Sequence, residues 1–147
     1  MILNACEGKS LPIYGDGSNV RDWLHVEDHC SGILAVLQKG RLGQTYCIGG
    51  ASEKTNMEVI NTLCSILDEK IPDYAPHAKL KTFVKDRPGH DQRYAIDFSK
   101  LSNELGWYPT YSFEKGMVQT VEWYLSNREW CENVTSGKYQ RERLGAT

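Results

Sequence analysis

The chain has 147 residues, 40% of them hydrophobic, which is enough for one ordinary domain and too little for two well-buried ones. Its formal net charge of −2 at pH 7 leaves no global basic field, so we expect neither nucleic acid nor a membrane surface as a partner. No apolar run approaches the roughly 20 residues of a bilayer span, and the N-terminus lacks a signal-type leader, which predicts a soluble, unexported protein.

The first part of the chain predicts a short helix followed by two extended segments. The sequence MILNACEGK has helical character, begins without a capping residue as though its first turns were missing, and stops at Gly8. The segments LPIYG (11–15) and RDWLHV (21–26) are strand-like, and the turn sequence DGSN separates them. A hairpin-like pair of strands is the arrangement that this pattern favours.

Residues 27–39 predict an amphipathic helix with acids in its first turn and Lys39 at its end. Its apolar residues recur at i, i+3, i+4 and i+7, and they are Cys30, Ile33, Leu34 and Leu37. The sequence GQTYCIGG (43–50) then predicts a short buried strand of β-branched and aromatic residues that leaves through a glycine pair. Strands that end in this way commonly feed a loop that faces a ligand.

The clearest helix signal is the capping box at residues 55–58, TNME, behind which an apolar stripe continues until Pro72. Two extended runs follow, KTFV (81–84) and RYAID (93–97). They flank the corner DRPGH (86–90), where a Pro-Gly pair stands between charged residues.

Asp97 can cap a short helix that ends at Gly106, and Ser112 begins a long final helix. The polar tail from Thr135 is expected to be loose or draped over a neighbour. With no internal repeat and no linker, residues 1–147 are predicted to form a single α/β unit. The sequence contains neither G-x-G-x-x-G nor G-x-x-x-x-G-K-[ST], so it offers no phosphate-cradling loop of either kind.

Two arginines and an asparagine could together bind an anion. Arg21 and Arg87 each present a planar fork of donors that suits phosphate, and Asn56 stands at a helix start with free backbone N–H groups. A pyrophosphate is the natural ligand of such a set. The alternative is that both arginines form surface ion pairs of little energetic value with their acidic neighbours, which are Asp22, Asp28, Asp86 and Asp91.

Other side chains admit two interpretations each. Tyr14 could offer a ring or hydroxyl to a base, or be a half-buried strand tyrosine, and His90 could bind a ribose or base, or be a loop histidine without a role. His25 and His29 would resemble a metal pair only if one helix held both, so we expect no metal site. The four tryptophans could stack on a sugar or base, although their spacing favours packing.

Nucleophilic catalysis has no motif in this sequence, because there is no G-x-S-x-G elbow. The five cysteines are odd in number, widely spread and never arranged as C-x-x-C, so neither a disulfide framework nor a zinc site is indicated. Cys30 and Cys64 lie in apolar stripes and are predicted to be core thiols. Reduced thiols in a cytoplasm fit this pattern best.

Several stretches, taken in order, resemble the C-terminal part of the dTDP-glucose 4,6-dehydratases, which are extended short-chain dehydrogenase/reductases of the NAD(P)-binding Rossmann-like superfamily. They are ILNACEGKSLPIYGDGSNVRDWLHVEDH, GQTYCIGG, EKTNMEV, DRPGHDQRYAID, LGWYPTYSFEKGM and TVEWYL. RDWLHVEDH and GWYPTYSFEKG are similar to the wider group of nucleotide-sugar enzymes, whereas DRPGHDQRYAID points to the dehydratases.

The resemblance implies a lyase family that uses a tightly held NAD to convert dTDP-glucose into dTDP-4-dehydro-6-deoxyglucose and water, on a route to rhamnose or another deoxysugar. It also implies a dTDP-sugar as the partner of this chain. By motif match, Pro12, Ile13 and Tyr14 look like the strand against the nucleotide, and Arg21 and Asn56 look like diphosphate contacts. Five further residues look like the loop that closes over nucleotide and phosphate, and they are Asp86, Arg87, Pro88, Gly89 and His90.

The family's glycine-rich NAD loop, its Tyr-x-x-x-Lys pair and its Asp-Glu acid/base pair have no counterpart in this sequence. We therefore expect no catalytic residue, no metal and no bound NAD in this chain alone, and its standing as an enzyme stays open. By the family pattern, residues 27–39 and 45–48 are the last helix and strand of the Rossmann sheet. Their apolar faces are then expected to be exposed, which predicts a homo-oligomer.

Two other functions stay open at this point. One is part of a sibling enzyme that acts on another nucleotide sugar, such as a UDP-glucuronate decarboxylase or an epimerase. The other is a non-catalytic module that binds a nucleotide sugar by itself, or a remnant that self-associates through its apolar surface. Binding of dTDP against UDP separates the first from the dehydratases, and sedimentation tests the second.

Overall fold

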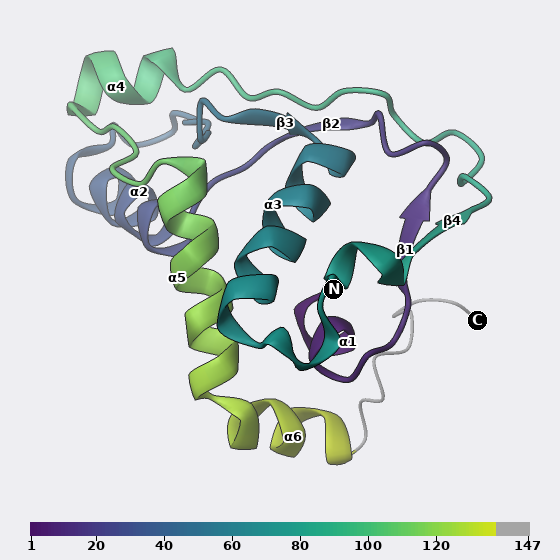
Figure 1. Cartoon of the computed structure of the whole chain (residues 1–147). Coiled ribbons are helices and arrows are strands. Elements are labelled where there is room, and N and C mark those ends of the chain that lie inside the picture. The colour runs from purple at the N-terminus through teal and green to yellow at the C-terminus, as the bar shows by residue number, and fades with distance from the viewer. Residues whose placement is uncertain (138–147) are drawn as a thin grey trace.

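The computed structural model describes residues 1–137 as an α/β unit in which short strands alternate with helices (Figure 1). The helices are α1 (Ile2–Cys6), α2 (Val26–Lys39), α3 (Asn56–Lys70), α4 (Ser99–Leu105), α5 (Phe113–Ser126) and α6 (Arg128–Ser136), with single 3-10 turns η1 (Pro72–Tyr74) and η2 (His77–Leu80). The strands are β1 (Leu11–Tyr14), β2 (Val20–Asp22), β3 (Glu53–Thr55) and β4 (Lys81–Val84). Within this range no helix is long and apolar enough to cross a membrane.

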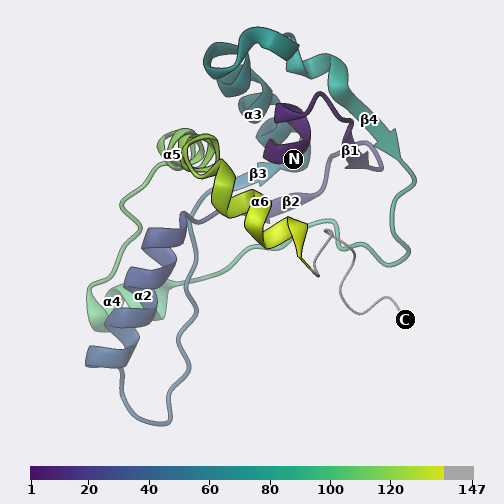
Figure 2. The same cartoon turned by 90° about the horizontal axis from the view of Figure 1, so that it is seen from below.

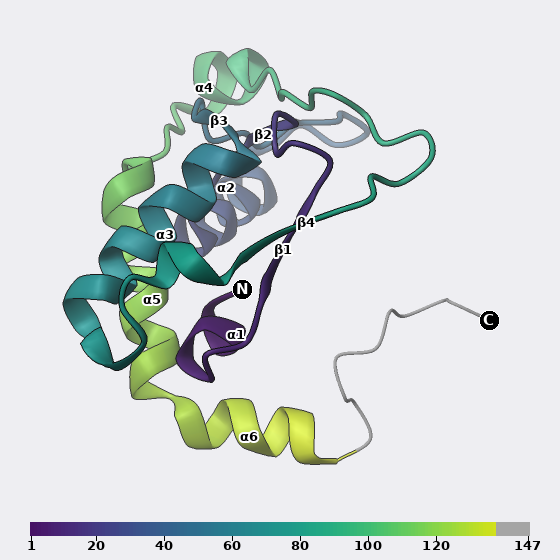
Figure 3. The same ribbon diagram turned by 45° about the vertical axis from the view of Figure 1, so that its right-hand side comes forward.

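The four described strands form two small sheets. β1 runs parallel to β4, with Tyr14 opposite Val84, and the two lie side by side in Figure 3. β2 runs antiparallel to β3, with Val20 opposite Thr55. The hairpin predicted from the first two extended segments is therefore wrong. The turn between them carries the chain from one sheet to the other, because each segment pairs with a strand that is distant in the sequence.

Helix α3 lies at the centre of the hydrophobic core. It begins with the predicted capping box, in which Thr55 Oγ1 accepts the N–H of Glu58 (3.1 Å) and Glu58 Oε2 accepts the N–H of Thr55 (2.7 Å). Its buried face meets α1, β1 and α5 in one cluster, which consists of Ala5, Leu11, Ile13, Ile60, Leu63, Cys64, Ile66, Leu67 and Val121. The core thus holds the end of β1 and the start of α3 in fixed relative positions.

Helices α2 and α4 lie together, away from α3 (Figure 2). Asp28 on α2 is only 2% exposed and accepts hydrogen bonds from the backbone N–H groups of Thr110 (3.0 Å) and Tyr111 (2.9 Å). The N-cap residue of α2 is His25, which accepts the N–H of Glu27 through Nδ1 (3.4 Å), and the predicted acids stand in the first turn. Asp28 fixes the loop before α5 to this helix.

The apolar stripe of α2 faces outward. Ile33 and Leu34 are each 50% exposed and Leu37 is 80% exposed, which confirms the expectation that this face has no cover within the described chain. The prediction that Cys30 is a core thiol is wrong because it lies on the same exposed face, whereas Cys64 on α3 is buried as predicted.

Two predicted strands are absent. Residues 45–48 form no strand because no described strand lies beside them to receive their backbone hydrogen bonds. Residues 93–97 form only an isolated bridge between Arg93 and Val20, after which the chain continues as an irregular extended segment to α4. A strand pattern in the sequence therefore produces a strand only where tertiary structure supplies a neighbour.

The elements after residue 97 follow the predictions more closely. The predicted cap Asp97 lies one residue before the N-cap of α4, which is Phe98 and makes no side-chain cap bond, but Asp97 Oδ1 accepts the backbone N–H of Ser99 (2.8 Å). The helix is followed by Gly106 with a φ of +69°, as predicted. Ser112 caps α5 as predicted, but the final helix breaks at Asn127 into α5 and α6. The loose tail was predicted to begin at Thr135, but Thr135 and Ser136 belong to α6; the rest of that tail, after residue 137, lies outside the described residues.

Candidate nucleotide-diphosphate site

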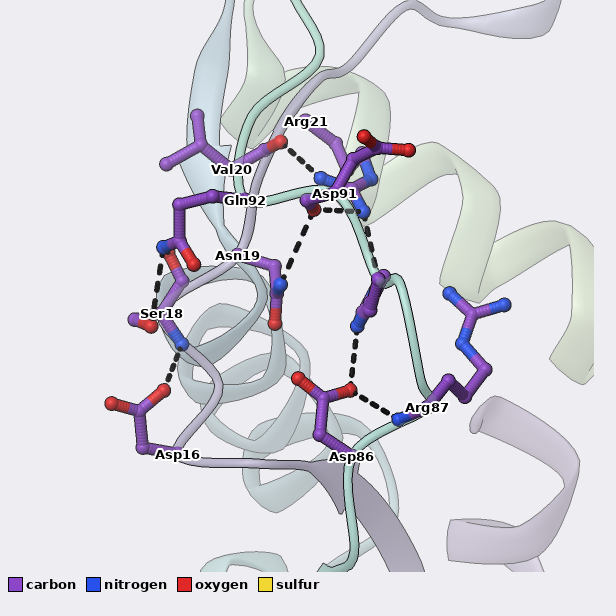
Figure 4. Close-up of polar contacts among 10 residues, drawn as sticks. Asp16, Ser18, Asn19, Val20, Arg21, Asp86, Arg87, Asp91 and Gln92 are labelled. Carbon is purple, nitrogen blue, oxygen red and sulfur yellow. Dashed lines mark hydrogen bonds and ion pairs between the residues drawn. The ribbon is translucent and has the colours of Figure 1, made fainter.

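The loop that follows β4 lies against β2, and together they line an open cavity of about 390 Å³. Its lining residues are Arg21, Arg87, Pro88, Gly89, His90, Asp91 and Tyr94. Five of these seven were singled out from the sequence, and two arginines from different segments meet at one cavity as the anion hypothesis requires (Figure 4). The site is assembled by the Val20–Arg93 bridge, which joins β2 to the end of the loop.

Arg21 on β2 is held in one orientation by three hydrogen bonds. Its Nη1 group donates to the carbonyl of Val20 (2.6 Å), and its Nη2 group donates to the carbonyl of Asp91 (2.9 Å) and to Nε2 of His90 (2.9 Å). The guanidinium also lies 4.6 Å from the ring centre of Tyr94. The predicted alternative, an ion pair with a neighbouring acid, does not occur for Arg21 within the described chain.

His90 joins Arg21 to the acidic residue at the start of the loop. Its Nδ1 lies 2.7 Å from Oδ1 of Asp86, and the same oxygen accepts the backbone N–H of Arg87 (2.8 Å). The His90 side chain is only 6% exposed, with its ring edge-on to Tyr14 at 6.3 Å between ring centres. These contacts fold the loop into a rigid corner around the buried imidazole.

Arg87 carries the charge at this site that is least compensated. Its guanidinium lies 5.3 Å from the ring centre of Tyr14 and forms no ion pair within the described chain (Figure 4). The figure shows the side chain turned away from the Asp86 carboxylate. The predicted alternative of an ion pair with Asp86 or Asp91 is therefore absent for this residue also.

The two acids of the loop are engaged by neutral or histidine partners. The hydrogen bond from His90 lowers the pKa of Asp86, so this carboxylate is ionised at neutral pH. Asp91 accepts the hydroxyl of Tyr94, and this hydrogen bond raises the pKa of Tyr94. Because neither acid pairs with an arginine, both guanidinium charges can serve an anion in the cavity.

The remaining predicted site residues lie near the cavity without lining it. Tyr14 ends β1 and reaches the site through Arg87 and His90, whereas Pro12 is exposed and Ile13 is a core residue with 1% exposure. Asn56 is the first residue of α3, and its backbone N–H donates to the carbonyl of Asn19 (2.9 Å). The side chain of Ile13 therefore packs in the core and does not line the cavity.

Three residues at the site were missed from the sequence. Asp91 and Tyr94 line the cavity, and Asn19, which is 3% exposed, donates through Nδ2 to the carbonyl of Asp91 (3.3 Å). Asp91 and Tyr94 belong to the same DRPGHDQRYAID stretch, so its full length was an available signal. Asn19 lies in a turn sequence, where nothing in the pattern indicates burial.

A larger cavity of about 860 Å³ lies between the start of α2 and the face of α5, and Trp23, Phe113 and Trp123 are among its lining residues. No arginine or lysine lines it, so size alone does not make it the anion site. Among residues 1–137 no group of three or more histidine, cysteine, aspartate or glutamate side chains is placed to hold a metal ion, and His25 serves as a helix cap.

Comparisons with known proteins agree on one family. A family model described as GDP-mannose 4,6 dehydratase matches residues 1–120. A curated dTDP-glucose 4,6-dehydratase from Xanthomonas campestris pv. campestris is 54% identical over 149 residues, which covers 100% of this chain and 42% of the relative. The chain thus spans about two fifths of the length of the curated relatives it matches.

Solved structures give the same result. A dTDP-glucose 4,6-dehydratase from Bacillus anthracis, in complex with NAD, is 52% identical with a TM-score of 0.76, over 88% of this chain and 39% of that one. DesIV, a dTDP-glucose 4,6-dehydratase from Streptomyces venezuelae with NAD and TYD bound, is 45% identical with a TM-score of 0.75, over 88% of this chain and 38% of that one.

Proposed function

We propose that this chain binds the nucleotide sugar dTDP-glucose. The chain belongs to the family described by the GDP-mannose 4,6 dehydratase model, and it matches the C-terminal part of extended short-chain dehydrogenase/reductases named dTDP-glucose 4,6-dehydratase. In the proposed reaction, dTDP-glucose is converted into dTDP-4-dehydro-6-deoxyglucose and water. The observation that carries the proposal is the convergence of Arg21 and Arg87 on one cavity with neither guanidinium paired to an acid.

In this proposal the two arginines hold the diphosphate. Arginine is suited to this because its planar N–H donors match two phosphate oxygens and its charge persists at every physiological pH. Asp86, Pro88, Gly89 and His90 shape the loop that covers the nucleotide, and Tyr14 offers its half-exposed ring beside Arg87. Pro12 and Ile13 belong with Tyr14 to the strand that is proposed to lie against the nucleotide, and Asn56 at the start of α3 is proposed as a further diphosphate contact.

The chain is proposed to bind and not to catalyse. Among the described residues, no serine, threonine, cysteine or lysine lines the cavity, and the two carboxylates of its loop, Asp86 and Asp91, are engaged by His90 and Tyr94. They do not fit NAD either, because no described strand leads through a glycine-rich turn into a helix N-terminus. We therefore derive no step through NAD from this chain.

A second candidate is a binding module or remnant that forms a homo-oligomer. The outward stripe of α2 favours it, because Ile33, Leu34 and Leu37 leave an apolar face open to another copy. A cytoplasmic location is part of either proposal and is supported by five cysteines that are all unpaired. Sedimentation at several concentrations measures the self-association, and a monomer at every concentration contradicts it.

Competition calorimetry with dTDP-glucose and UDP-glucose tests the binding function. We expect dTDP-glucose to bind and to be displaced by dTDP, with weaker binding of the UDP sugar. A preference for UDP-glucose would assign the chain to a sibling enzyme such as an epimerase or a UDP-glucuronate decarboxylase. A folded chain that binds neither nucleotide would favour the remnant.

A further inference from the structure

Asp86, His90 and Arg21 form a continuous hydrogen-bonded chain across the wall of the cavity. Asp86 Oδ1 lies 2.7 Å from His90 Nδ1, and His90 Nε2 lies 2.9 Å from Arg21 Nη2 (Figure 4). The imidazole between them is 6% exposed, so bulk water does not replace either contact. The protonation state of His90 therefore determines which contacts Arg21 can make.

The two contacts are compatible with only one form of the imidazole. An arginine guanidinium has donors and no acceptor, so the hydrogen bond between Arg21 and His90 requires a free lone pair on Nε2. The neutral ring then carries its hydrogen on Nδ1, which donates to the ionised Asp86. In this structure His90 is thus the neutral Nδ1–H tautomer.

The hydrogen bond between Arg21 and His90 keeps Arg21 from binding a phosphate with two parallel hydrogen bonds. Nη2 belongs to both edges of the guanidinium that can bind two oxygens, one shared with Nε and one shared with Nη1. Both N–H groups of Nη2 are already used, one by His90 Nε2 and one by the carbonyl of Asp91. A diphosphate must displace one of these acceptors before it can be held at two points.

We propose that His90 is a positioning residue. Its neutral ring occupies an N–H group of Arg21, and its protonation frees that N–H group to bind a nucleotide diphosphate. A proton taken from solvent occupies Nε2, removes the acceptor, and leaves an imidazolium that stays bound to Asp86. Arg21 regains a free N–H on Nη2, and the cavity gains a second positive charge beside it. This regulation rests on the proposed function, because it concerns the same nucleotide site.

The charges that surround His90 agree with such a switch. His90 faces the Asp86 carboxylate through Nδ1 and the Arg21 guanidinium through Nε2, and Arg87 lines the same cavity. Asp91 presents its backbone carbonyl to Arg21 while its carboxylate binds Tyr94, and Tyr14 turns its ring edge-on to the imidazole. A bound diphosphate neutralises the two arginines and so favours protonation, which couples binding to proton uptake.

Nuclear magnetic resonance of the free protein tests the contact without any nucleotide. At high pH the ¹⁵N shifts of His90 are expected to identify the Nδ1–H tautomer, and the Nη2 protons of Arg21 to give separate resonances because they are hydrogen-bonded. Protonation of His90 on acidification should shift the resonance of the Nη2 proton that His90 accepts, while the proton that is bonded to the Asp91 carbonyl changes less. An Nε2–H tautomer, or Arg21 resonances unaffected by the titration, would overturn the proposal.

Calorimetry with dTDP-glucose tests the consequence, since the diphosphate of this ligand has no proton to lose near neutrality. We expect affinity to rise at least about fivefold between pH 8 and pH 6, below the limit of about tenfold per pH unit that one linked proton sets. His90→Gln keeps an acceptor for Arg21 and cannot become a cation, so its affinity is expected to be independent of pH. His29→Gln, on the exposed face of α2, is the matched control and should retain the wild-type profile.

The outcomes separate this proposal from the proposed function. Binding with the same pH profile in wild type and His90→Gln refutes the role of His90 and leaves nucleotide binding intact. Absence of binding at every pH refutes the proposed function, and the tautomer and Arg21 resonances then still decide whether His90 holds and releases Arg21. If His90 only held Arg21 in place, His90→Gln would keep the wild-type dependence of affinity on pH. Loss of that dependence in a variant that still holds Arg21 therefore excludes a merely structural role for His90.

Discussion

The replacement Arg21→Ala tests the most specific feature of the site. It removes a guanidinium that contacts two backbone carbonyls and His90 and belongs to a residue that lines the cavity. A hydrogen bond to a charged group is worth about 1.5–3 kcal/mol, so the Kd for dTDP-glucose should rise roughly 10- to 150-fold. Stability should change less, because the carbonyls released by the mutation can be hydrated at this partly exposed position.

Isothermal calorimetry measures the affinity, and circular dichroism verifies that the variant is folded. Arg93→Ala is the matched control, because Arg93 lies in the same segment but pairs with Glu53 at the exposed surface, where a salt bridge contributes only about 0–1 kcal/mol. It should bind dTDP-glucose within about twofold of wild type. A folded Arg21→Ala variant with wild-type affinity would refute the assignment of Arg21 to the diphosphate.

Two further predictions concern stability and can be read from urea unfolding. Asp28→Ala should lower the free energy of unfolding by about 1–3 kcal/mol at pH 7, because the partly buried N–H groups of Thr110 and Tyr111 lose their buried acceptor. Burial alone would raise the pKa of Asp28, but these hydrogen bonds outweigh burial and lower the pKa. The contribution of Asp28 to the free energy of unfolding is therefore present above the usual aspartate pKa and disappears as the pH falls through the pKa of the folded state. An effect of Asp28→Ala as large at pH 2 as at pH 7 would contradict this. Thr55→Ala should cost about 1 kcal/mol by removing the cap of α3, and Thr55→Ser should restore most of it; equal stabilities of the two variants would show that the cap is not needed.

The sequence alone determined the elements whose stabilising contacts are local. The capping box of α3 and the glycine after α4 each lie within a few residues of the helix end that they stabilise, so the pattern contains the whole cause. Family membership was also predictable, because DRPGHDQRYAID and its companion stretches lie in order along the chain and the comparisons confirm the match. Five of the seven residues that line the cavity were identified for the same reason.

Only tertiary structure decided which segments pair and which charges meet. A strand pattern in the sequence does not specify which other strand it pairs with. The sequence therefore could not indicate that β1 pairs with β4, or that residues 45–48 would have no neighbouring strand. The partner of Arg21 likewise could not be deduced, because its acidic neighbours in sequence were the obvious choice. The fold instead brings His90, 69 positions away, to the guanidinium, since backbone pairing of Val20 with Arg93 sets the loop against β2.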